Sequence, residues 1–277
     1  MQAAVDDFGT ELEIINTNRD RQGMISAAAE LATRTNKPDD VIVANEIKQG
    51  RRAYKTLSEA SIKIFILLNP LQDSETIGLD TNNLVGRISP DNEIAGYAQA
   101  TRPAGKDSDG VQIMALLGDL VTPAAIKRTE GMERAVAEHA DAAIVRAMSV
   151  NWSADKAKDR TQRFLKAGQT ASTDMFFAGL NWSRPAMDAV SDGRMTMTHG
   201  GHFFAGAWSI ALLNDFHTGQ TAIDDQGFPM PPIHAENVDN FLERLGEGDW
   251  QRIDFQQFAS ENQEYDFSSD AILSASP

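Results

Sequence analysis

Two copies of a short motif contain the residues that could hold a small polar molecule. Asn151-Trp152-Ser153 and Asn181-Trp182-Ser183 each follow an apolar run and precede a helical pattern. An indole face can pack against the apolar CH face of a sugar ring, while a neighbouring amide hydrogen-bonds the hydroxyl groups. The alternative is that both tryptophans pack at the boundary of the core and that each serine caps a helix. The repetition favours the first interpretation and makes Trp152, Asn181 and Trp182 candidate ligand-binding residues.

Arg128 is a further candidate, because it lies in a helical pattern that begins at Thr122 and Pro123. Its planar guanidinium could donate paired hydrogen bonds to ligand oxygens. It could equally form a surface ion pair with Glu130 or Glu133. The sequence leaves both alternatives open.

The histidines favour structure over metal binding. His199 and His202 are three positions apart, a spacing that on a helix could place both on one metal ion. Gly200 and Gly201 between them instead indicate a turn from a strand to a helix, and no third ligand has suitable spacing. We therefore expect a packed turn here, and neither a metal ion nor a cofactor.

Composition and missing motifs exclude several functional classes. The 277 residues carry a formal net charge of −15 and contain no cysteine, which disfavours nucleic acid and anionic lipid and excludes disulfides. No Walker, dinucleotide-binding, nucleophile-elbow or zinc-protease motif is present. We expect a binding protein and not an enzyme, although carboxylate pairs are numerous enough to leave acid–base chemistry open. No apolar run is long enough to span a membrane, and no signal peptide is visible. The chain starts within a helical pattern that ends at Gly9.

Short apolar runs alternate with helical patterns along most of the chain, which predicts parallel sheets covered by helices on both faces. The expected strands are Glu11–Asn16, Asp40–Asn45, Lys63–Asn69, Asn83–Ser89, Gln112–Gly118, Ala142–Val150, Asp174–Leu180 and Arg194–His199. The expected helices are Gln22–Thr35, Gln49–Ala60, Asp91–Ala100, Thr122–His139, Ser153–Ala167, Ser183–Ser191, His202–Thr218 and Glu236–Leu245. Polar residues end several strands, where ligands bind in open parallel sheets, although each could simply cap the next helix.

The order of three motifs resembles that of type I periplasmic binding proteins, the sugar-binding receptors of ABC importers. These motifs are Pro38–Glu46, Ser89–Tyr97 and Pro123–Gly131, and the segment Gly200–Gly219 is similar to the return helix of one sugar-receptor subgroup. The resemblance implies an α/β fold of two Rossmann-like lobes joined by three crossovers. It assigns residues 1–89 and 200–234 to lobe 1, and residues 90–199 and 235–277 to lobe 2.

The resemblance also implies roles for individual residues in a cleft between the lobes. Lobe 1 and the hinge would supply Asn45, Ser89 and Asn92, and lobe 2 would supply Arg128, Trp152 and Asn181. His202 would lie at a hinge crossing where family members place a polar contact.

Two departures from the family pattern stand out. The family's first strand would precede Met1, and a strand and a helix expected between Phe164 and Asp174 are replaced by residues 165–173. Strand edges exposed in this way would favour pairing with a second copy of the chain.

The resemblance therefore predicts a periplasmic solute-binding protein that captures a sugar or polyol for the permease of an ABC importer. Two alternatives share the fold. One is a signal-molecule receptor that reports to a membrane sensor kinase, and the other is the effector-binding core of a lac-repressor-type regulator.

Overall fold

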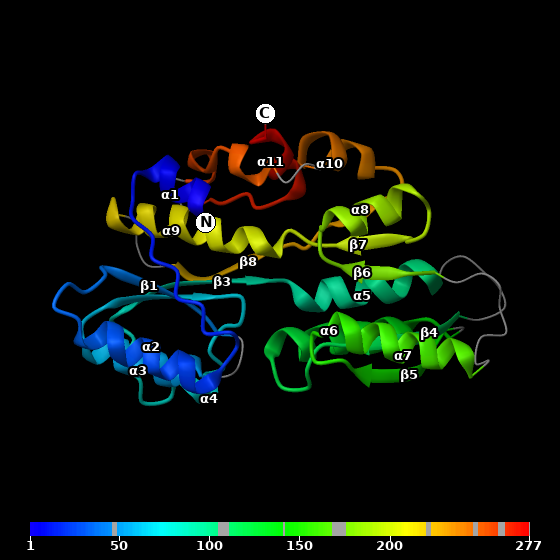
Figure 1. The fold of residues 1–277 in the computed structure, drawn as a ribbon, viewed down its shortest axis with the longest axis horizontal. Helices are drawn as coiled ribbons and strands as arrows, with labels where there is room; N and C mark the ends of the chain where they lie inside the picture. The colour runs from blue at the N-terminus through cyan, green and yellow to red at the C-terminus, as the bar shows by residue number, and fades with distance from the viewer. Residues whose placement is uncertain are drawn as a thin grey trace. The chain divides into compact units, whose positions relative to one another are not determined.

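The computed structural model describes residues 1–45, 49–140 without 105–110, 142–167, 176–219, 223–245, 249–259 and 264–276. The chain divides into two compact units (Figure 1). Unit 1 comprises Met1–Pro90, Gly200–Pro231 and Asp239–Pro277, and unit 2 comprises Asp91–His199 and Pro232–Val238. Within the described ranges, no helix is long and apolar enough to cross a membrane.

Unit 1 is built on a parallel sheet with the strand order β1-β2-β3-β8. The strands are β1 (Asp40–Ala44), β2 (Lys63–Leu67), β3 (Leu84–Pro90) and β8 (Ile223–Phe228). The apolar side chains of β2 from Ile64 to Leu67 are all buried, as expected for a strand covered on both faces. Helices α2 (Arg21–Thr33) and α3 (Gly50–Glu59) lie on one side of this sheet and α9 (Ala205–His217) on the other, and the short α4 (Asp73–Thr76) follows β2.

An aromatic cluster around α9 holds the C-terminal part of the chain in unit 1. The fully buried ring of Trp208 lies 4.5 Å from Phe267 and 5.0 Å from Phe228, measured between ring centroids. The elements here are α1 (Gln2–Phe8), the 3-10 helices η1 (His202–Phe204), η2 (Asp249–Arg252) and η3 (Phe255–Phe258), and the helices α10 (Val238–Leu245) and α11 (Ser269–Ser274). The structure differs from the expected lobes in two segments. Residues from 239 onward, expected in lobe 2, belong to unit 1, because these aromatic side chains pack on α9. Residues 232–234, expected in lobe 1, belong to unit 2, where they pair with Met197–His199.

The described residues of unit 2 form two small sheets. Strands β4 (Val111–Leu117) and β5 (Ala142–Ser149) pair in parallel. Helices α5 (Asn92–Ala104) and α6 (Pro123–Glu138) contact this sheet, and α7 (Ala154–Lys166) lies beside it (Figure 1). In the other sheet, β6 (Ala178–Leu180) pairs in parallel with β7 (Met197–His199), and β9 (Pro232–His234) pairs antiparallel with β7; α8 (Arg184–Ser191) packs against this sheet.

The structure corrects several of the expected strands. Glu11–Asn16 forms no strand, and Ile14 is 72 % exposed, because no described strand pairs with this segment and an unpaired strand is not stable in water. The strands β8 and β9 were not expected from the sequence, and β6 and β7 are shorter than expected. Most of the shortened interval at residues 165–173, like the start of the expected strand from Asp174, lies outside the described residues.

Candidate functional site

The backbone at the end of β5 presents Trp152 at the surface of unit 2. The amides of Val150 and Asn151 donate to the carbonyls of Leu117 and Gly118 at 2.9 and 3.0 Å, which continues the pairing with β4. Asn151 and Trp152 then adopt left-handed conformations, with φ of 51° and 59°. This tight turn leaves Trp152 37 % exposed.

Asp119 and Gly118 fix the position of the Trp152 indole. The indole Nε1 donates to Asp119 Oδ2 at 2.8 Å, and Asp119 also accepts the amides of Thr122 at 2.7 Å and Val121 at 2.8 Å. Partial burial opposes ionisation of this carboxyl, but the hydrogen bonds outweigh it and lower the pKa of Asp119. The ring lies so close to Gly118 that a Cβ atom there would stand 2.2 Å from Trp152 Cζ2.

Arg128 lies over the Trp152 ring, with its Cζ 5.5 Å from the ring centroid. Its Nε donates to Asn92 Oδ1 at 2.8 Å, so the guanidinium is held from two sides by neutral groups. Burial lowers the pKa of Arg128 to about 10, which keeps the side chain charged at neutral pH. Within the described part of the chain, neither terminal Nη atom has a hydrogen-bond partner. Neither of the surface ion pairs considered for Arg128 forms, and Glu130 pairs with Lys127 instead.

Two glycines bring α5 and α6 close enough for this contact. A Cβ atom on Gly96 would lie 2.0 Å from the carbonyl oxygen of Arg128, and one on Gly131 would lie 2.0 Å from that of Glu93. Because both obstacles are backbone atoms, only glycine allows the helices this close approach. The approach brings Asn92 at the start of α5 within hydrogen-bonding distance of Arg128 on α6.

The structure thus brings together three residues predicted from the sequence, Asn92, Arg128 and Trp152, and adds Asp119, which sequence reasoning missed. We call these four residues the Trp152 cluster. The signal for Asp119 was available, because an acidic residue directly follows the expected strand Gln112–Gly118. Chemically, the cluster offers an aromatic surface beside a charged donor with unused hydrogen-bonding capacity, which suits an uncharged ligand rich in oxygen.

Two other predicted site residues are buried. Trp182 is 2 % exposed, unlike Trp152, and its role in ligand binding remains a prediction. The side chain of Asn45 is buried, accepts the Gly50 amide at 2.9 Å and donates to the Asn69 carbonyl at 3.2 Å. It therefore connects the ends of β1 and β2 to the start of α3.

The remaining predicted residues lie at strand ends or turns. Ser89 is half-buried in β3 opposite Gly227 of β8, and His202 is half-buried at the start of η1; both belong to unit 1. Asn181 of unit 2 is exposed after β6, with φ of 130° and its amide 2.6 Å from the His199 carbonyl oxygen. In the described ranges, no three potential metal-ligating side chains come together.

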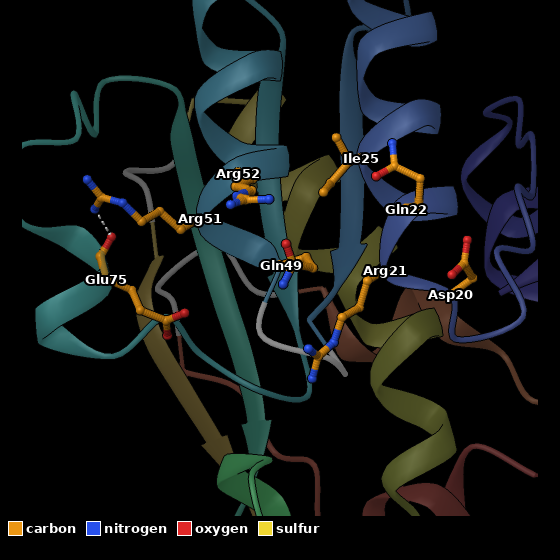
Figure 2. A pocket seen from close by; sticks show the side chains of 8 residues that line it. All are labelled: Asp20, Arg21, Gln22, Ile25, Gln49, Arg51, Arg52 and Glu75. Carbon is orange, nitrogen blue, oxygen red and sulfur yellow. Dashed lines mark hydrogen bonds between the residues drawn. The ribbon is translucent and has the colours of Figure 1, made fainter.

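Unit 1 carries a pocket of about 600 Å³ that sequence reasoning did not identify (Figure 2). It lies where α2 and α3 begin, and Arg21 extends from α2 toward the start of α3. The lining residues are Asp20, Arg21, Gln22, Ile25, Gln49, Arg51, Arg52 and Glu75. Three arginines in one pocket stand out in a chain with a net charge of −15.

Comparison with known proteins identifies the family. The model of the periplasmic binding protein domain matches residues 1–207. A search of curated proteins found no match. A periplasmic sugar-binding protein from Pseudomonas fluorescens is 26% identical with a TM-score of 0.85, over 99% of this chain and 93% of its own.

Two more solved structures share the fold at lower identity. The binding protein of an arabinose ABC transporter from Shewanella sp. ANA-3, bound to arabinofuranose, is 17% identical with a TM-score of 0.76, over 87% of each chain. A Caulobacter myo-inositol binding protein is 16% identical with a TM-score of 0.74, over 86% of this chain and 88% of its own. Taken with the parallel α/β architecture, these matches show that the chain belongs to the periplasmic binding protein domain family and has the type I fold.

Proposed function

We propose that this chain is a periplasmic solute-binding protein that holds a sugar or polyol at the Trp152 cluster and delivers it to the permease of an ABC importer. One observation carries the proposal. Arg128 is charged and positioned by Asn92 and Trp152, yet both of its Nη atoms lack a hydrogen-bond partner in the described residues. A half-buried guanidinium in this state has two Nη donors available to ligand oxygens.

The chemistry of the cluster suits a polyhydroxylated ring. Hydroxyl oxygens accept from the two Nη atoms of Arg128, and the CH groups of the ring pack on the exposed part of the Trp152 indole. Asp119 keeps the indole in place and is occupied by three donors, so it supports the site instead of binding the solute. Ser89, Asn181 and His202 remain predicted ligand-binding residues.

The family and its structural neighbours support import as the purpose of binding. The protein from Pseudomonas fluorescens is described as periplasmic and sugar-binding, and the Shewanella protein is a component of an ABC transporter. Neither the sensor-kinase alternative nor the repressor alternative has comparable support. A second copy of the chain as partner also remains a prediction.

Calorimetric titration with L-arabinose, myo-inositol and D-allose tests the proposal. We expect at least one of them to bind, and Arg128→Gln to weaken that binding about tenfold or more, because it removes a charged hydrogen-bond donor pair. Arg194→Gln is the matched control, since Arg194 is an exposed arginine of unit 2 that pairs with Asp192 at 2.9 Å. Silence toward a broad monosaccharide panel, or equal affinity in the Arg128 variant, would overturn the proposal.

A further inference from the structure

Asn181 of unit 2 has a backbone conformation that asparagine seldom adopts. Its φ is 130°, well outside the left-handed region of about 50–70° that asparagine tolerates. A residue in such a conformation persists only where the surrounding structure holds it, and residues of this kind gather at ligand-binding sites. Asn181 also lies beyond the carboxyl end of the parallel strand β6, which is where open α/β sheets bind ligands.

Two hydrogen bonds hold this conformation, one on each side of the Asn181 Cα atom. The amide of Asn181 donates to the carbonyl of His199 at 2.6 Å. The hydroxyl of Thr198 donates to the carbonyl of Asn181 at 2.7 Å. The amide belongs to the peptide plane before Cα and the carbonyl to the plane after it, so fixing both planes fixes φ and ψ. These two angles determine where the Asn181 side chain points.

Thr198 is a fixed donor because it is held in the interior of unit 2. It is 0 % exposed in β7, where it pairs with Gly179 on one side and Ile233 on the other. Its side chain is branched at Cβ, which restricts χ1. Strand β6 is fixed as well, since Gln99 of α5 donates to the Gly179 carbonyl at 2.7 Å. The backbone of Asn181 is therefore shaped by groups that have little freedom to move.

The side chain of Asn181 is available to a ligand. The residue is exposed, and among the described residues neither polar atom of its side chain forms a hydrogen bond. A carboxamide offers two donor hydrogens and an acceptor oxygen, which match hydroxyl groups that both donate and accept. The guanidinium of Arg128 in the Trp152 cluster can only donate. Asn181 would therefore add an acceptor to the groups that unit 2 offers a polyhydroxylated solute.

We infer that Thr198 is a positioning residue of the solute site: its buried hydroxyl holds the strained backbone of Asn181 and so directs the Asn181 carboxamide to the hydroxyl groups of a bound sugar or polyol. This role rests on the proposed function and extends it to a residue that does not itself contact the solute. The alternative is that Thr198 only packs within the sheet. The two interpretations differ once the Asn181 side chain is removed, because a packing role does not depend on that side chain.

Calorimetry with whichever of L-arabinose, myo-inositol and D-allose the unmodified chain binds tests this role. Thr198→Val removes the hydroxyl and keeps the branched shape, so we expect Kd to weaken about three- to tenfold, the effect of about one neutral hydrogen bond. Thr198→Ser keeps the hydroxyl and should keep Kd within about twofold. Thr101→Val is the matched control and should leave Kd unchanged, because the Thr101 hydroxyl also donates to a backbone carbonyl, that of Tyr97 at 3.1 Å.

A double-mutant cycle separates positioning from packing. Asn181→Gly removes the carboxamide and leaves a residue that accepts a φ of 130° without strain. In that background Thr198→Val should cause no further loss of affinity, because no side chain remains to be directed. Crystal structures of the two Thr198 variants give a second measurement, which needs no ligand. The φ of Asn181 should leave the positive range in Thr198→Val and stay near 130° in Thr198→Ser.

Failure of this role and failure of the proposed function give different results. Silence of the unmodified chain toward every sugar and polyol tested would overturn the proposed function and this role with it. If the unmodified chain binds, an equal Kd in Thr198→Val, or an equal loss with and without the Asn181 side chain, would overturn the role of Thr198 alone. An Asn181 that keeps its φ in Thr198→Val would do the same. Circular dichroism checks folding, and should Thr198→Val unfold, Thr198→Ala replaces it in each comparison, since it removes the hydroxyl without placing a methyl group beside the Asn181 carbonyl.

Discussion

Replacing Gly118 with alanine should weaken sugar binding without removing any residue of the Trp152 cluster. Gly118 does not have the left-handed conformation that requires glycine, so the backbone accepts an alanine. The new methyl group would stand 2.2 Å from Trp152 Cζ2, whereas ordinary van der Waals contact for a Cβ begins at 3.4 Å. The indole must therefore move by about 1.2 Å, the difference between these two distances.

The size of the effect follows from the contacts that this movement breaks. The indole loses its hydrogen bond to Asp119 at 2.8 Å and its position 5.5 Å from the Arg128 guanidinium. A hydrogen bond contributes about 0.5–1.5 kcal/mol and an exposed cation–π contact about 0.5–1 kcal/mol. A loss of about 1–2 kcal/mol corresponds to roughly a 5- to 30-fold weaker Kd. Stability should fall by about 1–2 kcal/mol as well, because both contacts lie within the folded chain and are lost with or without a bound sugar.

A double-mutant cycle measures whether the methyl group acts through the ring. Calorimetry with the sugar bound by the unmodified chain would be repeated on Gly118→Ala, Trp152→Ala and the double variant. We expect Gly118→Ala to have no effect in the Trp152→Ala background, because the clashing ring is gone, so the coupling energy equals the whole single-variant effect. An undiminished Kd in Gly118→Ala, or the same loss with and without Trp152, would refute this account of the site.

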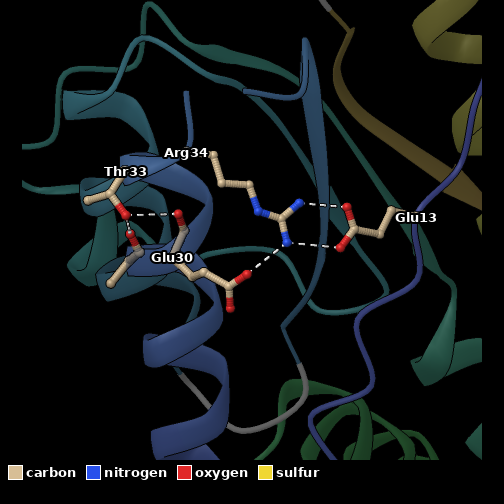
Figure 3. A network of polar contacts seen from close by, with 5 residues as sticks. Glu13, Glu30, Thr33 and Arg34 are labelled. Carbon is tan, nitrogen blue, oxygen red and sulfur yellow. Dashed lines mark hydrogen bonds and ion pairs between the residues drawn. The ribbon is translucent and has the colours of Figure 1, made fainter. Parts of the chain in front are cut away.

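Three further predictions concern packing and charge. Gly96→Ala should lower the free energy of unfolding by about 3 kcal/mol in denaturant titrations, because its Cβ would stand 2.0 Å from a backbone oxygen. Gly227→Ala is the control and should leave the denaturation midpoint unchanged, because a Cβ there would have no atom within 4 Å. Trp208→Ala should cost about 3–5 kcal/mol in the same assay, and a smaller loss would contradict its central place in the aromatic cluster. Arg34 donates a hydrogen bond to Glu13 and lowers the pKa of that carboxyl (Figure 3). The pair therefore stabilises the fold at neutral pH, and this stabilisation is lost as the pH falls through the lowered pKa of Glu13. Arg34→Gln should return the pKa of Glu13 toward its ordinary value in an NMR titration, and an unchanged pKa would exclude the contact in solution.

Hydrophobic patterning predicted the strands that are apolar. It missed strands that form only because a neighbouring strand offers them backbone hydrogen bonds. The run Ile64–Leu67 indicates a buried strand by composition, and the structure buries every one of its side chains. Residues 223–228, with the sequence Ile-Asp-Asp-Gln-Gly-Phe, carry no such pattern, yet they form β8 because β3 offers a free parallel edge. The opposite case is Glu11–Asn16, whose composition favours a strand that lacks a partner.

The two Asn-Trp-Ser motifs show why spacing alone could not identify the site. Their side chains are identical, and the sequence predicted the same role for both tryptophans. In the first copy Asn151 and Trp152 both have positive φ, whereas in the second only Asn181 does. The two asparagines also differ, with φ of 51° at Asn151 and 130° at Asn181, and these backbone differences accompany a ring that is 37 % exposed in Trp152 and 2 % exposed in Trp182. A left-handed conformation at tryptophan is intrinsically unfavourable, so its presence at Trp152 must be stabilised by the surrounding contacts. The hydrogen bond to Asp119 and the close fit over Gly118 supply that stabilisation, and both come from the β4 end, over 30 positions earlier in the chain, where no local motif records them.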